Sequence, residues 1–200
     1  MRFQTKNGVL IAQANGETLR IEPWGKDSLR VRATMLPEFS GKDWALTEVP
    51  EKTEAKAEQF EVDHLEIDGS MGKRTSASIT NGKIRAVVNF AGVITFYKEE
   101  QEILREYHRC YDGTISKESR CLKTVNREWK GVIGGSEYSL NLKFESNDGE
   151  KIFGMGQYQQ KYMDLKGCTL ELAQRNSQIS VPFAILGNSI TDGKGSTTDH

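Results

Sequence analysis

Apolar and polar residues alternate along several short segments of this chain, with the period of two that is typical of a β-strand with one buried face. One such segment runs from Tyr138 to Phe144, and another follows the Asn81-Gly82 step. The apolar positions that this alternation predicts to be buried are Ile21, Leu29, Val31, Ile84, Val88, Phe90, Leu140, Leu142 and Phe144. The pattern therefore predicts half-buried strands and little helix.

Seven Asn-Gly or Asp-Gly steps punctuate these segments. Such steps tolerate the positive φ angles that tight hairpin turns require, so each is a turn signal with a physical basis. The steps are Asn7-Gly8, Asn15-Gly16, Asp68-Gly69, Asn81-Gly82, Asp112-Gly113, Asp148-Gly149 and Asp192-Gly193. Strands joined by tight turns are antiparallel, and we expect an all-β fold, an antiparallel β-sandwich.

Two stretches fit this pattern less well. Residues Glu51 to Gln59 are rich in Glu, Lys and Ala without an apolar stripe, which leaves a short exposed helix and a loop as alternatives. Residues Lys98 to Arg109 have helical propensity, but they alternate and directly follow a strand expected from Val93 to Tyr97. We therefore expect a turn at Glu99 to Gln101 and a returning strand.

Composition excludes several classes of function. Two hundred residues suit one domain that buries a core without disulfides or metal. With 27 basic and 28 acidic residues the net charge is −1, so no overall field attracts nucleic acid or an anionic membrane. The first twenty residues contain only a short apolar run, Val9 to Ala12, so we expect neither a secretory signal nor a membrane span, and a cytoplasmic protein.

Metal and cofactor sites are not expected either. Three cysteines form no C-x-x-C pair, three histidines are scattered along the chain, and reduced cysteines fit a cytoplasmic protein. The Gly-x-Gly at 154–156 is not a dinucleotide motif, because Gln159 stands where the third glycine belongs and no helix pattern follows. We therefore predict no cofactor.

The run Phe153-Gly154-Met155-Gly156-Gln157, with the stretch Asn176 to Phe183, is the most specific part of the sequence. It resembles the end of the N-terminal, galactose-mutarotase-like β-sandwich of glycoside hydrolase family 31, the α-glucosidase and α-xylosidase family. Gly167-Cys168 and Glu171 to Asn176 look most like its α-xylosidase members. The resemblance assigns residues 1–184 to this sandwich.

The resemblance also bears on catalysis. In the family a (β/α)₈ barrel follows the sandwich and supplies two catalytic aspartates. The chain stops at His200, so the resemblance implies an accessory module without a reaction centre, in which no Asp or Glu inherits a catalytic role. A sandwich without its barrel exposes apolar surface and a strand edge, so we expect a homo-oligomer.

A candidate carbohydrate-binding loop follows the glycine motif. Gln157, Tyr158, Gln159 and Gln160 offer amides that both donate and accept hydrogen bonds, and a ring with an apolar face. Such groups suit the hydroxyls and C–H faces of an α-xyloside or α-glucoside, and loops of this domain line the substrate pocket in the family. The alternative is that the glycines only form a turn and the glutamines are solvent-exposed.

The tail, residues 185–200, does not continue the family pattern. Gly187-Asn188-Ser189-Ile190-Thr191 resembles the first block of SGNH esterases, where the serine is the nucleophile. Later blocks of that family, with the base and the rest of the oxyanion hole, are absent from the sequence. A joined or truncated reading frame and a linker that mimics the block are the two interpretations. The alternative to an inactive accessory module is a hydrolase active in its own right. It would be an esterase that uses Ser189 or a glycosidase that uses carboxylates of the sandwich.

We predict that Ser189 does not act as a nucleophile. A serine hydroxyl needs an imidazole within hydrogen-bond reach, and the histidines here are His64 and His108 in the sandwich and His200 at the chain end. Hydrolysis of nitrophenyl acetate by the purified chain should match that of Ser189→Ala. Turnover that disappears in Ser189→Ala would make the esterase interpretation the primary one.

Overall fold

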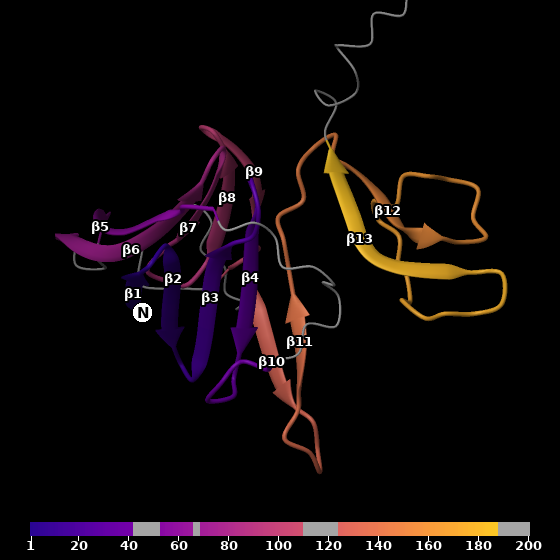
Figure 1. Ribbon diagram of the computed structural model, residues 1–200, viewed down its shortest axis with the longest axis horizontal. Coiled ribbons are helices and arrows are strands. Elements are labelled where there is room, and N and C mark those ends of the chain that lie inside the picture. The colour runs from indigo at the N-terminus through magenta and orange to yellow at the C-terminus, as the bar shows by residue number, and fades with distance from the viewer. Residues whose placement is uncertain (42–52, 66–68, 110–123, 188–200) are drawn as a thin grey trace, which may run out of the picture. The chain divides into compact units, whose positions relative to one another are not determined.

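The computed structural model of this protein describes residues 1–41, 53–65, 69–109 and 124–187, and in these ranges every regular element is a β-strand (Figure 1). No helix is therefore present there that is long and apolar enough to cross a membrane. The strands pair antiparallel throughout. By its internal contacts the chain divides into a first unit, Met1–Glu145, and a second unit, Ser146–His200.

A four-stranded sheet opens the first unit. Its strands follow chain order: β1 (Arg2–Lys6), β2 (Val9–Ala14), β3 (Glu17–Pro23) and β4 (Leu29–Thr34). The first two hairpins have two-residue loops, Asn7-Gly8 and Asn15-Gly16, and all four loop residues have positive φ. This is the type I′ geometry that Asn-Gly favours, so these two turn predictions are confirmed.

A five-stranded sheet follows, again in chain order. It consists of β5 (Lys56–Leu65), β6 (Met71–Asn81), β7 (Ile84–Val88), β8 (Ile94–Lys98) and β9 (Gln101–Arg105). The hairpin predicted at Asn81-Gly82 is confirmed, but Asn81 is the last residue of β6 and the two-residue loop is Gly82-Lys83, with Gly82 at φ +59°. The turn at Glu99 and the returning strand are confirmed as well, with Glu99 at φ +56°.

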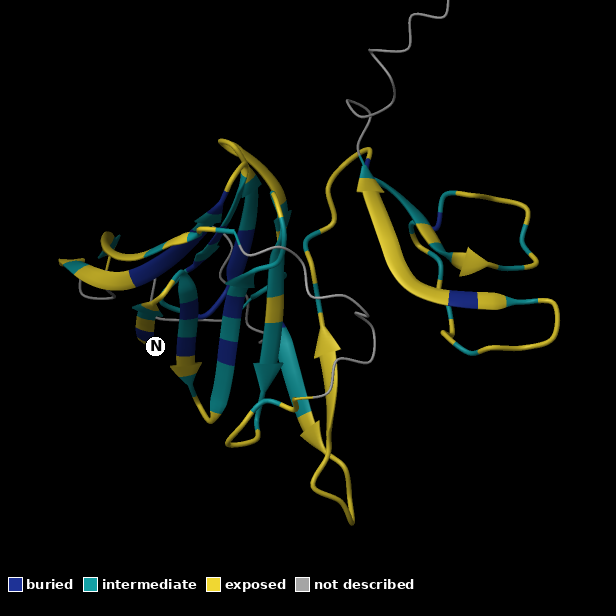
Figure 2. Cartoon of the chain, viewed as in Figure 1, coloured by how far each residue is buried: buried dark blue, intermediate teal, exposed yellow. Residues whose placement is uncertain are grey.

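The core of the first unit lies between these two sheets. Buried apolar side chains come from alternate positions of both, and Figure 2 shows them as dark blue bands on the strands. They are Phe3, Leu10, Ala12, Leu19 and Ile21 from the first sheet, and Ala77, Ile79, Ala86, Val88 and Ile94 from the second. The prediction of an antiparallel β-sandwich is confirmed.

A separate two-stranded ribbon, β10 (Arg127–Gly131) and β11 (Tyr138–Leu142), completes the first unit. The prediction that its apolar residues are buried is wrong: Leu140, Leu142 and Phe144 are 41–43% exposed. Period-two alternation indicates that a strand has an apolar face, but not that a broad sheet covers it. Strand β11 pairs with β10 alone, and beyond it Phe144 forms a single β-bridge to Glu106.

Two further expectations need correction. Val31, at 38% exposure, is not buried, and Leu29, Ile84 and Phe90 are only half-buried. Val31 and Leu29 both lie on β4, an edge strand of the first sheet, whereas the fully buried Ile21 lies on the interior strand β3. The expectation that Glu51 to Gln59 form a short helix or a loop is wrong from Lys56 onward. Strand β5 begins there and pairs with β6 over its whole length. Partner strands override weak local propensity at this point.

The second unit is built on one long hairpin. Strand β12 (Lys151–Gln157) pairs antiparallel with β13 (Ile179–Gly187), and a long connection, residues 158–178, joins them. Residues Val181 to Leu186 belong to β13. Residues 188–200, including Ser189 and the Asp192-Gly193 step, lie outside the described residues, as does the Asp112-Gly113 step.

Candidate functional site

The loop predicted to bind carbohydrate leaves the end of β12. Gln157 is the last residue of the strand, and Tyr158, Gln159 and Gln160 follow it without regular structure. Gln157 and Gln159 are exposed, whereas Tyr158 and Gln160 are half-buried. The four residues therefore share one segment but do not present equivalent side chains.

A bulge in the hairpin sets the course of this segment. Gly154, Met155 and Gly156 have φ angles of +98°, +64° and +111°, three left-handed residues in succession. Gly154 pairs with Ala184 and Gly156 with Ser180, so Met155 alone lies opposite residues 181–183. A Cβ on Gly154 would lie 2.5 Å from the carbonyl oxygen of Phe183. At 154 and 156 only glycine combines such φ angles with so close a partner strand, and such bulges redirect side chains.

Tyr158 is held by a small polar cluster around Ser180. Its hydroxyl donates to Ser180 Oγ at 3.0 Å, and that hydroxyl donates in turn to the carbonyl of Ala173 at 2.9 Å. The amide of Gln174 binds the backbone of Ser180 on both sides, donating to its carbonyl at 2.8 Å and accepting from its N–H at 3.3 Å. The Tyr158 hydroxyl is thus engaged internally, and its ring remains half-buried.

Gln174 and Ser180 were not predicted to act in this site. Both belong to the stretches that carry the family resemblance, but their side chains bind backbone between the end of the connection and the start of β13, and a single sequence does not reveal that contact. Gln160 also differs from expectation in one respect, because its Nε2 donates to the carbonyl of Tyr162 at 3.4 Å. The exposed amides of Gln157 and Gln159 remain the polar groups of the segment that are open to a ligand.

The long connection is anchored against β12 by Asp164. Its Oδ1 accepts the backbone N–H of Ile152 at 3.0 Å and that of Lys166 at 3.1 Å, while Leu165 N–H donates to the carbonyl of Ile152 at 2.7 Å. The two backbone hydrogen bonds, with Lys151 and Lys166 nearby, lower the pKa of Asp164. Leu165 is buried beside it. The connection is therefore tied down at its midpoint by an ionised carboxylate.

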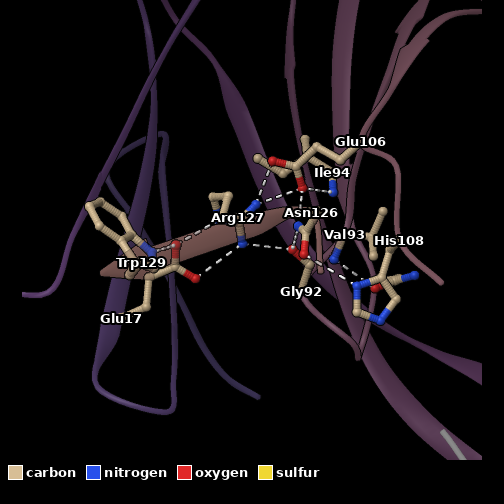
Figure 3. Close-up of polar contacts among 10 residues, drawn as sticks. Glu17, Gly92, Val93, Ile94, Glu106, His108, Asn126, Arg127 and Trp129 are labelled. Atoms are coloured by element: carbon tan, nitrogen blue, oxygen red, sulfur yellow. Dashed lines mark hydrogen bonds and ion pairs between the residues drawn. The ribbon is translucent and has the colours of Figure 1, made fainter. Parts of the chain in front are cut away.

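Two carboxylates of the first unit, Glu17 and Glu106, bind the same arginine, Arg127 (Figure 3). Arg127 Nη1 donates to both oxygens of Glu106 at 2.5 and 2.6 Å, and its Nε donates to Glu17 at 2.6 Å. Its Nη2 also donates to the carbonyl of Gly92 at 2.8 Å. Burial alone would lower the pKa of Arg127, but its hydrogen bonds and charge interactions with Glu17 and Glu106 outweigh burial and raise it.

Further donors complete this network. Glu106, 2% exposed, also accepts the N–H of Ile94 at 2.9 Å and the amide of Asn126 at 2.5 Å. Trp129 Nε1 donates to Glu17 at 3.1 Å. Because the Asn126 amide nitrogen donates to Glu106 and Gly92, its oxygen is the acceptor at 3.3 Å from His108 Nδ1. That nitrogen of His108 therefore carries a proton.

This network is poorly suited to glycoside hydrolysis. A catalytic pair needs one protonated carboxylic acid and one free carboxylate with a sugar between them. Here both carboxylates accept charge-assisted hydrogen bonds from one guanidinium, and Glu106 is buried. Among the described residues no group of three or more His, Cys, Asp and Glu side chains is placed to hold a metal ion. The arrangement is that of a structural ion network.

Comparison with known proteins identifies relatives along most of the chain. An uncharacterized family 31 glucosidase from Pseudescherichia vulneris is 43% identical over 176 residues, which cover 84% of this chain and 30% of the relative. Alpha-xylosidase A from Aspergillus niger is 25% identical over 208 residues, which cover 96% of this chain and 27% of the relative. The chain thus spans less than a third of these relatives' length. No family model matches it.

Solved structures give the same result for the fold. The crystal structure of a GH31 alpha-xylosidase from a soil metagenome, complexed with xylose, matches with a TM-score of 0.80 and 41% identity. The match covers 93% of this chain and 26% of that one. A GH31 alpha-xylosidase from Xanthomonas citri matches with a TM-score of 0.59 and 21% identity, over 86% of this chain and 16% of that one, and supports the fold alone.

Replacing Arg127 by methionine should destabilise the first unit strongly. The substitution leaves Glu106 buried without its cation, and breaking a buried ion pair in this way costs ~3–5 kcal/mol. Arg105→Met is the matched control, because its ion pair with Glu102 is 43–44% exposed and should contribute less than ~1 kcal/mol. Urea unfolding measures both. A loss in Arg127→Met as small as the one expected for the control would contradict a stabilising role of the network.

Replacing Gly156 by alanine should open the β12–β13 hairpin. An alanine at φ +111° is strained by ~1–2 kcal/mol, and its Cβ would also overlap the carbonyl oxygen of Ile179. Gly167→Ala shares the positive φ, +78°, but meets no atom within 4 Å. Hydrogen exchange of the β12 and β13 amides should therefore accelerate more in Gly156→Ala than in Gly167→Ala. Similar rates in the two variants would contradict close packing at the bulge.

Proposed function

We propose that this chain, whose sequence and fold are those of a partial glycoside hydrolase family 31 domain, is an accessory β-sandwich module that contacts carbohydrate and has no reaction centre of its own. The observation that carries the proposal is the match to a xylose-complexed family 31 alpha-xylosidase, at 41% identity over 93% of the chain. We take residues 1–184 as the sandwich module and 185–200 as a tail.

The substrate class follows from these relatives and from the loop chemistry. Gln157 and Gln159 present exposed amides next to the half-buried ring of Tyr158, and the half-buried Gln160 follows them. Amides match the paired donors and acceptors of sugar hydroxyls, and an aromatic ring packs against C–H faces. A sugar of the α-xyloside or α-glucoside class is the ligand we propose for this loop.

A catalytic role for the sandwich carboxylates is the weaker candidate. Glu17 and Glu106 are both bound to Arg127, and neither is available as a free acid or nucleophile. The absence of an esterase role for Ser189 stays a prediction from the sequence, because that residue lies outside the described ranges.

The proposal includes self-association. Strand β13 exposes Ile179, Val181, Phe183 and Ile185 on one face, each by 44–60%, and it carries no charge along its length. Apolar strand surfaces of this kind tend to associate, which supports a homo-oligomer. The cytoplasmic location expected from the sequence is also part of this proposal.

Titration of the purified chain with xylose and glucose tests the carbohydrate assignment. We expect weak binding, in the millimolar range, that shifts backbone amide resonances of residues 157–160. The double variant Gln157→Ala/Gln159→Ala should weaken it at least tenfold, because it removes the exposed amides. Gln101→Ala, an exposed glutamine at the start of β9, is the matched control and should bind as the unmodified chain does.

Hydrolysis of nitrophenyl xyloside and nitrophenyl glucoside tests the second half of the proposal. The chain should not turn over either substrate. Turnover that is lost in Glu106→Gln, in a variant shown to remain folded, would overturn the accessory assignment. Absence of sugar-induced shifts at residues 157–160 would instead remove the loop as a binding site.

A further inference from the structure

The outer face of the four-stranded sheet is strongly basic. Residues of β1 to β4 that alternate with the buried core positions point away from the core, as their register shows. The charged residues among them are Arg2, Lys6, Arg20, Arg30 and Arg32, with Glu22 as the acidic one. This face thus carries five cations and one anion, a net charge of +4, on a chain whose overall net charge is −1.

Two of these arginines are placed directly opposite each other. Arg20 on β3 and Arg32 on β4 are register partners, and like charges in such cross-strand pairs are destabilising. Both bind the same carboxylate, Glu22, each through Nη2 to a different oxygen at 2.8 Å. One negative charge is therefore shared by two guanidinium groups that face each other. Arg30 lies 3.9 Å from the same carboxylate and stacks on Trp24.

The hydrogen bonding of this pair is incomplete. The Nε atoms of Arg20 and Arg32 are buried and have no acceptor within the described part of the chain. The side chains themselves remain reachable, with 35% and 24% exposure, and Arg32 is held over the ring of Phe39 at 5.1 Å. An unpaired buried donor costs free energy, and that cost is higher for a charged group. The pair thus has two Nε donors without an acceptor and one carboxylate for two positive charges.

We propose that Arg20 and Arg32 form a binding site for an oxyanion, a carboxylate or phosphate group carried by a small molecule such as an acidic or phosphorylated sugar. Guanidinium groups bind these anions through charge-assisted, planar hydrogen bonds. A second anion beside Glu22 can bind the partly exposed guanidinium ends of both arginines, and its charge offsets the repulsion between the opposed cations. A neutral sugar offers no charge, so this site is distinct in chemistry from the loop at residues 157–160.

Thermal unfolding of the full chain in the presence of anions tests this site. Inorganic phosphate and glucuronate are the probes, glucose is the uncharged control, and sodium chloride keeps the ionic strength constant. A ligand that binds only the folded state raises the unfolding midpoint in proportion to its affinity. We expect a rise with phosphate, with glucuronate or with both, and none with glucose; which anion acts distinguishes a phosphate from a carboxylate ligand.

Substitutions locate the effect. Arg20→Gln and Arg32→Gln should each weaken anion binding at least tenfold, and Arg20→Lys, which keeps the charge but loses the planar fork, should weaken it less than Arg20→Gln does. Arg2→Gln removes an exposed cation of the same face on β1 and should leave the anion response unchanged. Far-ultraviolet circular dichroism confirms that each variant is folded.

Two results would overturn the site. One is an unfolding midpoint that neither anion raises above the sodium chloride reference. The other is an anion response in folded Arg20→Gln and Arg32→Gln that equals that of the unmodified chain, since the cations would then act only through their overall charge. Resonances of the Arg20 and Arg32 Nε–H groups give a second readout, because bound anion shifts them and structural ion pairing alone does not.

Discussion

The first unit depends on the buried guanidinium of Arg127. This side chain connects Glu17, at the start of β3 in one sheet, with Glu106, which follows β9 in the other, and it also binds the carbonyl of Gly92. The apolar core holds the two sheets together without fixing their relative alignment, because the hydrophobic effect is non-directional. The hydrogen bonds of Arg127 have a fixed geometry and so determine how the two sheets are aligned. Because Glu106 is buried, losing these bonds costs much free energy of folding.

Hairpins were the part of the fold that the sequence predicted well. Asn7-Gly8 and Asn15-Gly16 each join adjacent strands, and Gly82 lies in the loop between β6 and β7, because the backbone angles of a tight turn are set by the turn residues themselves. Burial of Ile21 and Val88 was equally predictable, since both lie in the middle of a sheet whose alternation is regular. Turn residues and period-two patterning are sufficient to predict the hairpins and the buried positions of this kind.

Other features depend on contacts that no local pattern encodes. Strand β5 begins at Lys56 within a segment of low strand propensity, because β6 provides a full-length partner. Leu140 lies on an alternating strand but remains 42% exposed, because its sheet has two strands. In the candidate loop, the glutamines at 157 and 159 were predicted and are exposed. The hydrogen bonds of Gln174 to Ser180, in contrast, depend on how the end of the connection folds back onto the start of β13.

The connectivity of the sheets has a consequence for the order in which the chain can assemble. Every pairing within the two large sheets joins neighbours in sequence, so each sheet closes only short loops. The bond between Arg127 and Glu17, in contrast, joins residues 110 positions apart. Closing a flexible loop of that length costs roughly 4 kcal/mol of chain entropy, a cost that falls once the intervening hairpins have shortened the effective loop. If the meanders form first, they bring the distant charges together. We therefore expect the hydrogen bond between Arg127 and Glu17 to form last, between sheets that already exist.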